Sequence, residues 1–173
     1  MSSRRTFLIG MPGSGKSTVG RLLAEKRGHS FLDLDDQIEE NCGMAISEIF
    51  AREGEEYFRK KEAEILRLTI ARSPAGVIAC GGGTPCFHNN MELINSTGIS
   101  VYIEVSPEEI AARLEADGKE LRPLLKEYSG TGLVYHLSEK LKNRALYYEK
   151  ARLIVSASGI DPDRLAEQIT QKL

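Results

Sequence analysis

The stretch Gly10-Met-Pro-Gly-Ser-Gly-Lys-Ser17 constrains this chain more than any other. It follows the apolar run 7–9 and matches the pattern G-x-x-x-x-G-K-S/T at every position. Glycines let backbone N–H groups turn inward around a triphosphate, while the lysine can reach the β- and γ-phosphates and the serine can ligate Mg²⁺. We therefore expect a nucleoside triphosphate and Mg²⁺ here. The predicted nucleotide-binding residues are Gly13, Ser14, Gly15, Lys16, Ser17 and Thr18.

Short apolar runs alternate with helical patterns along the whole chain. Five strands are predicted, over 6–10, 30–35, 76–80, 100–105 and 152–158. The helical pattern between 35 and 72 has a break near Gly54. Gly28 is a predicted C-cap, Ser106-Pro107-Glu108-Glu109 a predicted capping box, and Asp161-Pro162 the start of a closing helix. This alternation predicts one α/β domain over 1–173, with a parallel sheet covered by helices on both faces.

Composition narrows the class of protein further. Hydrophobic residues make up 41% of the 173 residues and the net charge is -2, so no basic field favours nucleic acid or an anionic membrane surface. No apolar run approaches the ~20 residues that cross a bilayer. We therefore expect a cytoplasmic protein without a nucleic-acid or membrane partner. Three cysteines without C-x-x-C spacing and three histidines without metal-ligand spacing predict reduced thiols and no Cys/His metal site.

Acidic residues gather at the end of the second predicted strand. Asp33 and Asp35 are two residues apart and would face the same way on an extended segment. Beside a phosphate-binding loop, one carboxylate could hold Mg²⁺ through water and the other could orient a hydroxyl proton. The alternative is an acidic N-cap for the next helix, and we assign Asp36 to capping.

Further candidate site residues follow these acids along the chain. Arg59 and Glu62 share a helix face, for which a solvated ion pair is the ordinary alternative. Gly81-Gly82-Gly83 ends a buried strand, which suggests close approach of a ligand or backbone, or else a tight turn. Arg122 lies in a polar loop over about 117–132, where a phosphoryl-transfer lid is expected. Arg144 follows in a late helix, with a basic surface as its alternative.

Taken in order, these features resemble the shikimate kinase family. The series runs from the phosphate loop through D-x-D (33–35), F-R-x-x-E (58–62), G-G-G (81–83) and R-P-L-L (122–125) to the late arginine, and spans residues 7 to about 148. The resemblance implies transfer of a phosphoryl group from ATP to the 3-hydroxyl of shikimate. It also implies a five-stranded parallel sheet in three α/β/α layers, of the P-loop kinase type with a lid loop, and a cytoplasmic monomer.

The resemblance also implies roles for individual residues. Asp33, with Ser17, would bind Mg²⁺, and Asp35 would contact the accepting hydroxyl as the base. Glu62 would orient the arginines, and Arg122 would meet the phosphates alongside Lys16. The implied shikimate-binding residues are Asp35, Arg59, Gly81, Gly82, Gly83 and Arg144, on substrate-binding helices over about 35–62 and the late helix. Arg113 would cover the purine by cation–π stacking, with 156–158 bounding it from below.

One position departs from the family pattern. Members usually carry a proline two residues after the late arginine, whereas this chain has Leu146, with Tyr148 still in register. A proline would kink or stiffen the helix. We expect Arg144 to keep its role.

Three alternatives stay open at this point. A related kinase of another hydroxylated acid, such as gluconate, would share the phosphate loop but would not be expected to keep F-R, G-G-G and R-P together. A nucleoside monophosphate kinase would carry an Asp-Arg pair at mid-chain, and the pair here is at 163–164. A silent nucleotide-binding module should have lost Lys16, Asp35 or Arg122, all of which are present.

Overall fold

Parallel strands form a five-stranded sheet in the computed structural model of the chain, which describes residues 5–73, 75–116 and 129–173. The strands are β1 (Arg5–Ile9), β2 (Phe31–Asp33), β3 (Gly76–Ala79), β4 (Gly98–Glu104) and β5 (Leu153–Ser156), in the order β2-β3-β1-β4-β5. Phe7, Leu8 and Ile9 of the central strand are fully buried, because helices cover both faces of the sheet. The predicted strands and their parallel pairing are confirmed.

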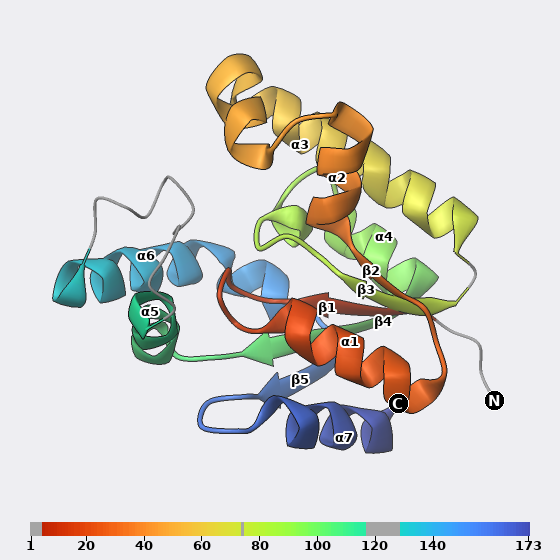
Figure 1. The fold of residues 1–173 in the computed structure, drawn as a ribbon, viewed down its shortest axis with the longest axis vertical. Coiled ribbons are helices and arrows are strands. Elements are labelled where there is room, and N and C mark those ends of the chain that lie inside the picture. The colour runs from red at the N-terminus through yellow and green to blue at the C-terminus, as the bar shows by residue number, and fades with distance from the viewer. Residues whose placement is uncertain (1–4, 74, 117–128) are drawn as a thin grey trace.

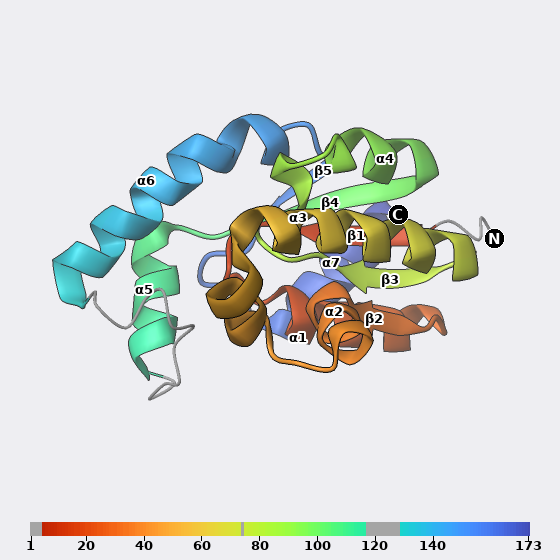
Figure 2. The same cartoon turned by 90° about the horizontal axis from the view of Figure 1, so that it is seen from above.

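The helices complete the three predicted layers. Helices α1 (Lys16–Arg27) and α7 (Pro162–Lys172) pack side by side on one face, and α3 (Ile46–Arg72) and α4 (Asn90–Thr97) cover the other (Figure 1). Helix α2 (Leu34–Cys42) packs against α3. Helices α5 (Pro107–Ala116) and α6 (Gly130–Tyr148) pack together beside the carboxyl ends of the strands (Figures 1 and 2). No helix within the described ranges is long and apolar enough to cross a membrane.

The register of the central strands brings three loops together. Ala79 of β3 pairs with Leu8 of β1 on one side and with Asp33 of β2 on the other. The Cys80 N–H continues this contact by donating to the Leu8 carbonyl at 3.0 Å. The loops that follow β1, β2 and β3 therefore meet at one edge of the sheet, which is where α/β folds bind ligands.

The boundary between β2 and α2 differs from the prediction. The strand ends at Asp33, and Asp35 already lies in the first turn of α2, so the two carboxylates do not share an extended segment. Asp33 is the N-cap, and its Oδ1 accepts the Asp35 N–H at 3.0 Å. The assignment of capping to Asp36 was wrong, because a cap must precede the first helical N–H groups that it satisfies.

Other predicted boundaries are confirmed or corrected by backbone geometry. Gly54 (φ 81°, ψ 174°) breaks α3, and Gly28 (φ 61°) is the C-cap of α1, both as predicted. The Glu109 N–H donates to Ser106 Oγ at 3.3 Å, which is half of the capping box. The other predicted bond, from the Ser106 N–H to the Glu109 carboxylate, is wrong. The Ser106 N–H donates to Ser158 Oγ, and the Glu109 carboxylate accepts the Gly159 N–H instead.

Three further segments complete the comparison with the sequence. Asp161 caps α7 as predicted, since its Oδ1 accepts the Asp163 and Arg164 N–H groups. Helix α6 begins at Gly130, inside the loop predicted over 117–132; residues 117–128 of that loop, Arg122 included, lie outside the described residues. The short 3₁₀ helix η1 (Thr84–Cys86) and α4 were not predicted.

Candidate active site

A cavity of about 760 Å³ opens at the carboxyl edge of the sheet. Its lining includes these predicted residues: Ser17, Asp33, Asp35, Arg59, Glu62, Gly81, Gly82, Gly83 and Arg144. They come from the end of β2, the starts of α1 and α2, from α3 and α6, and from the loop after β3. The fold thus gathers in one space the predicted metal ligands and every predicted substrate residue.

The phosphate-binding loop has the backbone that its glycines predict. Gly10, Gly13 and Gly15 have φ values of 144°, 82° and 88°, which side-chain-bearing residues rarely adopt. A Cβ at Gly10 would lie 2.6 Å from the Ile103 carbonyl oxygen, so this position also lacks room for one. The loop ends at Gly15, the N-cap of α1, so that the first N–H groups of the helix remain available to an anion.

Lys16 already lies inside this loop. Its Nζ donates to the carbonyl oxygens of Gly10 at 3.0 Å and Met11 at 2.7 Å, and to Ser14 Oγ at 3.4 Å, and the residue is 8% exposed. The ammonium is thereby fixed next to the backbone N–H groups of the loop. Gly13 and Thr18, at the outer side of the loop and on the first turn of α1, are exposed.

Ser17 and Asp33 form a pair of oxygen ligands. The Ser17 hydroxyl donates to Asp33 Oδ2 at 2.5 Å, which joins the start of α1 to the end of β2. Mg²⁺ prefers oxygen ligands and is commonly held by one or two side chains together with substrate phosphates. This pair fits that pattern. No cluster of three or more His, Cys, Asp or Glu residues suited to a metal occurs in the part of the chain that the structure describes.

Each glycine of the run 81–83 makes room for a different side chain. A Cβ at Gly81 would lie 2.7 Å from Asp35 Oδ1, and one at Gly83 would lie 2.6 Å from both terminal nitrogens of Arg59. At Gly82 it would meet the Pro12 ring at 2.6 Å and Arg144 Nη1 at 3.1 Å. The three glycines therefore let one acid and two arginines converge on a single stretch of backbone.

Arg59 is held from two sides. Its Nη1 lies 2.9 Å from Glu62 Oε2, and its Nε and Nη2 both lie 3.2 Å from Glu55 Oε1. The guanidinium carbon also lies over the Phe87 ring at 4.4 Å and the Phe58 ring at 5.0 Å. The side chain is only 9% exposed, so its ion pairs are far less screened than a solvated pair would be.

Glu62 is the most buried acid of the site. It is 1% exposed, and this burial raises the pKa of its carboxyl, while the charge of Arg59 and a hydrogen bond from Thr84 work in the opposite direction. The Thr84 hydroxyl donates to Glu62 Oε1 at 2.6 Å. The carboxylate thus connects η1 to Arg59 of α3. Arg59 and Glu62 form a buried ion pair, and not the solvated pair that the sequence also allowed.

Arg144 enters the cavity from α6. Its Nη1 is buried and has no hydrogen-bond partner among the residues that the structure describes. Four residues on, the buried Tyr148 hydroxyl donates to the Gly82 carbonyl, and burial raises the pKa of this phenol. Leu146 is 72% exposed, and α6 continues through it to Tyr148. The missing proline therefore does not remove Arg144 from the site.

Arg113 of α5 lies against the phosphate-binding loop. Its Nη1 donates to the Ser14 carbonyl at 3.4 Å and its Nη2 pairs with Glu109. Glu109 also accepts the Gly159 N–H, which ties α5 to the segment after β5. Arg113, predicted to cover the purine, thus adjoins the phosphate-binding loop.

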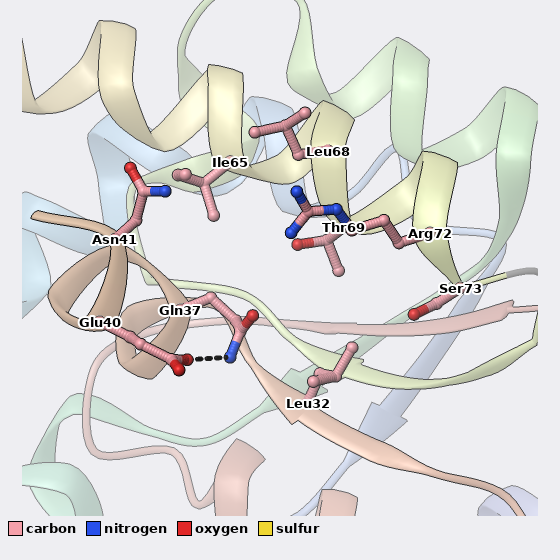
Figure 3. Close-up of a pocket in the computed structure, with 9 residues that line it drawn as sticks. All are labelled: Leu32, Gln37, Glu40, Asn41, Ile65, Leu68, Thr69, Arg72 and Ser73. Atoms are coloured by element: carbon pink, nitrogen blue, oxygen red, sulfur yellow. Dashed lines mark hydrogen bonds between the residues drawn. The ribbon is translucent and has the colours of Figure 1, made fainter.

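A second hollow, of about 510 Å³, lies between α2, the end of α3 and the edge strand β2 (Figure 3). On the α2 side, Gln37 Nε2 donates to Glu40 Oε2 at 3.2 Å, and Arg72 and Thr69 come from α3. None of the predicted site residues lines this hollow.

Sequence reasoning missed several residues of the active-site cavity. Lys140 lines it one helical turn before Arg144, so the spacing of four was an available signal. Pro12 and Phe50, which also line the cavity, had no such signal. Phe87 and Thr84 reach Arg59 and Glu62 only because the loop after Gly83 folds back over α3.

The sheet order, the phosphate-binding loop and the acid- and arginine-lined cavity define a P-loop kinase. The family model for shikimate kinase matches residues 12–173, and the chain belongs to the shikimate kinase family. A shikimate kinase of Parabacteroides distasonis is 46% identical over 89% of this chain and 88% of its own length. One of Azobacteroides pseudotrichonymphae is 40% identical over 98% and 99%.

Solved structures agree with this assignment. Shikimate kinase from Bacteroides thetaiotaomicron superposes with a TM-score of 0.91 at 34% identity, covering 98% of this chain and 97% of that one. Shikimate kinase from Acinetobacter baumannii in complex with shikimate gives a TM-score of 0.89 at 35% identity, covering 99% and 93%. The expected family and fold are therefore confirmed, and the chain is a kinase that uses ATP as co-substrate.

Proposed function

We propose that the chain transfers the γ-phosphoryl group of ATP to the 3-hydroxyl of shikimate through the residues of the cavity at 81–83. The observation that carries this proposal is the convergence of Asp35, Arg59 and Arg144 on three consecutive glycines. Shikimate has one carboxylate and three hydroxyls, so its site needs arginine donors and an acid. A relative at 35% identity, from Acinetobacter baumannii, has been solved in complex with shikimate.

At the acceptor end, Arg59 and Arg144 bind the shikimate carboxylate and neighbouring hydroxyls, and Gly81, Gly82 and Gly83 form the wall. The buried Arg144 Nη1, which lacks a partner within the described part of the chain, supports this role because a bound oxygen would satisfy it. Asp35 accepts the proton of the 3-hydroxyl as that oxygen attacks the γ-phosphorus, and Glu62 orients Arg59.

At the nucleotide end, the loop N–H groups, Lys16 and the start of α1 bind the phosphates, with Gly13, Ser14, Gly15 and Thr18 around them. Ser17 and Asp33, whose side-chain oxygens already pair, would hold Mg²⁺, Asp33 through water. When bound, Mg²⁺ neutralises the charge that develops on the phosphates. Arg113 covers the purine. Arg122, outside the described residues, meets the transferred phosphoryl group.

Membership of the family supports our proposals for the whole protein. We propose one kinase domain over 1–173, with substrate-binding helices over about 35–62 and a lid over about 117–132. We also propose a cytoplasmic monomer that binds neither nucleic acid nor membrane. Light scattering of the purified protein tests the monomer, and a mass of twice 19.1 kDa or more contradicts it.

The activity is tested by ADP release from MgATP with shikimate, with gluconate and without an acceptor. We expect release that depends on shikimate. Release with gluconate instead would keep the kinase and overturn the acceptor site, and no acceptor-dependent release would favour a silent module. Asp35→Asn should lower kcat on the order of 10²- to 10⁴-fold without lowering the melting temperature. Nearly unchanged turnover would show that Asp35 is not the base.

A further inference from the structure

Thr84, which no sequence motif pointed to, is the first residue of η1 and is fully buried. Its hydroxyl donates to Glu62 Oε1 at 2.6 Å. The other oxygen of the same carboxylate, Oε2, accepts from Arg59 Nη1 at 2.9 Å. One carboxylate therefore connects the buried hydroxyl to the arginine that lines the cavity.

The position of Thr84 is set by hydrogen bonds of its backbone. The Thr84 N–H donates to the Gly81 carbonyl at 3.1 Å, and the Thr84 carbonyl accepts Asn90 Nδ2 at 3.0 Å. Asn90, the first residue of α4, is fully buried as well. Thr84 thus belongs to a hydrogen-bonded turn that begins within the glycine run, and this turn places its side chain beside Glu62.

The carboxylate needs this donor because it is 1% exposed. A buried carboxylate oxygen that loses its hydrogen bond must find another donor, and Arg59, which already pairs with the other oxygen of this carboxylate, is one such donor. A rotation of Glu62 toward Arg59 would turn the guanidinium, which also packs on Gly83 and Phe87. The consequence would be a change in how the arginine faces the cavity.

We propose that Thr84 is a positioning residue for the acceptor: its hydroxyl holds the Glu62 carboxylate so that Arg59 faces the carboxylate of shikimate. The proposal rests on the proposed function of Arg59. It assigns to Thr84 an effect on acceptor binding, transmitted through Glu62 and Arg59, and no contact with either substrate.

Two pairs of variants isolate the hydroxyl. Thr84→Val keeps the shape of the wild-type side chain but lacks its hydroxyl. Thr84→Ser and Thr84→Ala likewise differ from each other only by the hydroxyl. We expect KM for shikimate to rise about tenfold in the Val and Ala variants, the effect of one lost hydrogen bond to a charged group. The Ser variant should stay within about twofold of wild type, and kcat and KM for ATP should change little in all three. The Ala and Ser pair still decides the matter if the Val variant does not fold.

A double-variant cycle tests the route. In a Glu62→Gln background the amide no longer provides the charged acceptor, so adding Thr84→Val should raise KM for shikimate less than twofold further. An unchanged KM in Thr84→Val and Thr84→Ala would overturn the proposal, even with a lowered melting temperature. A full additional tenfold effect in the Glu62→Gln background would overturn the route through Glu62. Absence of shikimate-dependent turnover in the wild type would instead refute the proposed function.

Discussion

At the residue scale, the glycine run 81–83 has a more specific role than ligand approach alone. Sequence reasoning explained the glycines by a ligand, or a backbone, that comes close. In the structure, each absent Cβ leaves space for a protein side chain: Asp35 at Gly81, Arg144 and Pro12 at Gly82, and Arg59 at Gly83. Substitution of any one glycine should therefore disturb one identifiable partner.

Gly83→Ala makes the sharpest test of this view. Its Cβ would lie 2.6 Å from Arg59 Nη1 and Nη2, so the guanidinium must move. We expect KM for shikimate to rise at least about tenfold, equivalent to roughly 1.4 kcal/mol, with KM for ATP unchanged. Steady-state kinetics with each substrate varied in turn measures both.

Gly132→Ala is the matched control. Gly132 lies in α6, and a Cβ added there would have nothing within 4 Å, so the new methyl group meets no neighbour. This variant should keep both KM values and gain about 0.5–1 kcal/mol of stability from helix propensity. Equal KM values for shikimate in the two variants would contradict the role of Gly83.

The pH dependence of acceptor binding should follow Glu62. Burial raises the pKa of this carboxyl, and the charge of Asp35 adds to the shift, whereas Arg59 and Thr84 oppose it. Buried Cys80, also nearby, is neutral because burial raises the pKa of its thiol. Since the folded-state pKa of Glu62 exceeds that of a free glutamate, falling pH neutralises it early and removes the ion pair of Arg59. We expect KM for shikimate to rise on acidification, beginning above the pH at which a free glutamate titrates.

The sign of the matching stability effect is also fixed. A raised folded-state pKa means that the folded protein binds this proton more tightly, so Glu62 favours folding below the unfolded-state pKa and loses that contribution as pH rises through the folded-state pKa. Glu62→Gln cannot titrate, and its KM for shikimate should stay flat over the same range. A pH profile that persists in this variant would assign the titration to another group.

At the element scale, sequence patterns predicted strands and most helix ends because local chemistry decides them. Gly28 and Gly54 adopt positive φ, and Asp161 supplies a side-chain acceptor to the first turn of α7. The wrong predictions of helix caps arose where more than one residue could make the same hydrogen bond. Asp33 caps α2 because the strand ends one residue before Leu34, and Glu109 bonds to Gly159, fifty positions along the chain.

The active site was predictable only where residue type and spacing together indicate a chemical role. The phosphate-binding loop, the acids and the arginines have distinctive spacing. Thr84 and Phe87 are ordinary in the sequence, and they reach Glu62 and Arg59 through the unpredicted η1 turn. Contacts of this kind depend on how two elements cross in space, which local patterns do not encode.

The kink in α3 positions the aromatic wall of the site. Gly54 (φ 81°, ψ 174°) turns the chain so that Phe50 returns to Phe58, with ring centroids 4.5 Å apart. Only glycine adopts this region readily, so Gly54→Ala should cost about 1–3 kcal/mol and should raise KM for shikimate by displacing Phe50. Urea unfolding and steady-state kinetics measure the two effects.

Gly28→Ala provides the comparison for the kink. Gly28 also has a positive φ of 61° and nothing within 4 Å of a Cβ, but it lies at the end of α1 remote from the cavity. This variant should lose stability, about 1 kcal/mol, without a change in KM. If Gly54→Ala likewise loses only stability, the kink has no role in acceptor binding.

At the scale of the whole molecule, the proposed acceptor and nucleotide regions lie around the loop after β1. Arg59 and Arg144 line the cavity proposed for the acceptor, and Arg113, proposed for the nucleotide, lies against the phosphate-binding loop. Because none of the residues proposed to contact the acceptor is also a proposed metal ligand, shikimate should bind without Mg²⁺. Removal of the metal should therefore stop turnover and leave acceptor binding in place.

Chelation with EDTA tests this separation. Turnover should cease, and shikimate at 100 times its Kd should still raise the melting temperature by about 5 °C or more, from roughly 2.7 kcal/mol of binding. In Arg59→Ala the shift should disappear while MgATP still stabilises the protein. Loss of the shikimate shift in EDTA with wild-type protein would place the metal in the acceptor site.

The two carboxylate oxygens of Asp33 have a consequence for how the two substrates affect each other. Oδ2 accepts the Ser17 hydroxyl, and Oδ1 accepts the Asp35 N–H that starts α2. Any reorientation of Asp33 when the nucleotide binds would therefore shift α2, which carries Asp35, through this second hydrogen bond. The bond network predicts heterotropic coupling, and by reciprocity shikimate should alter the affinity for MgATP by the same factor that MgATP alters the affinity for shikimate.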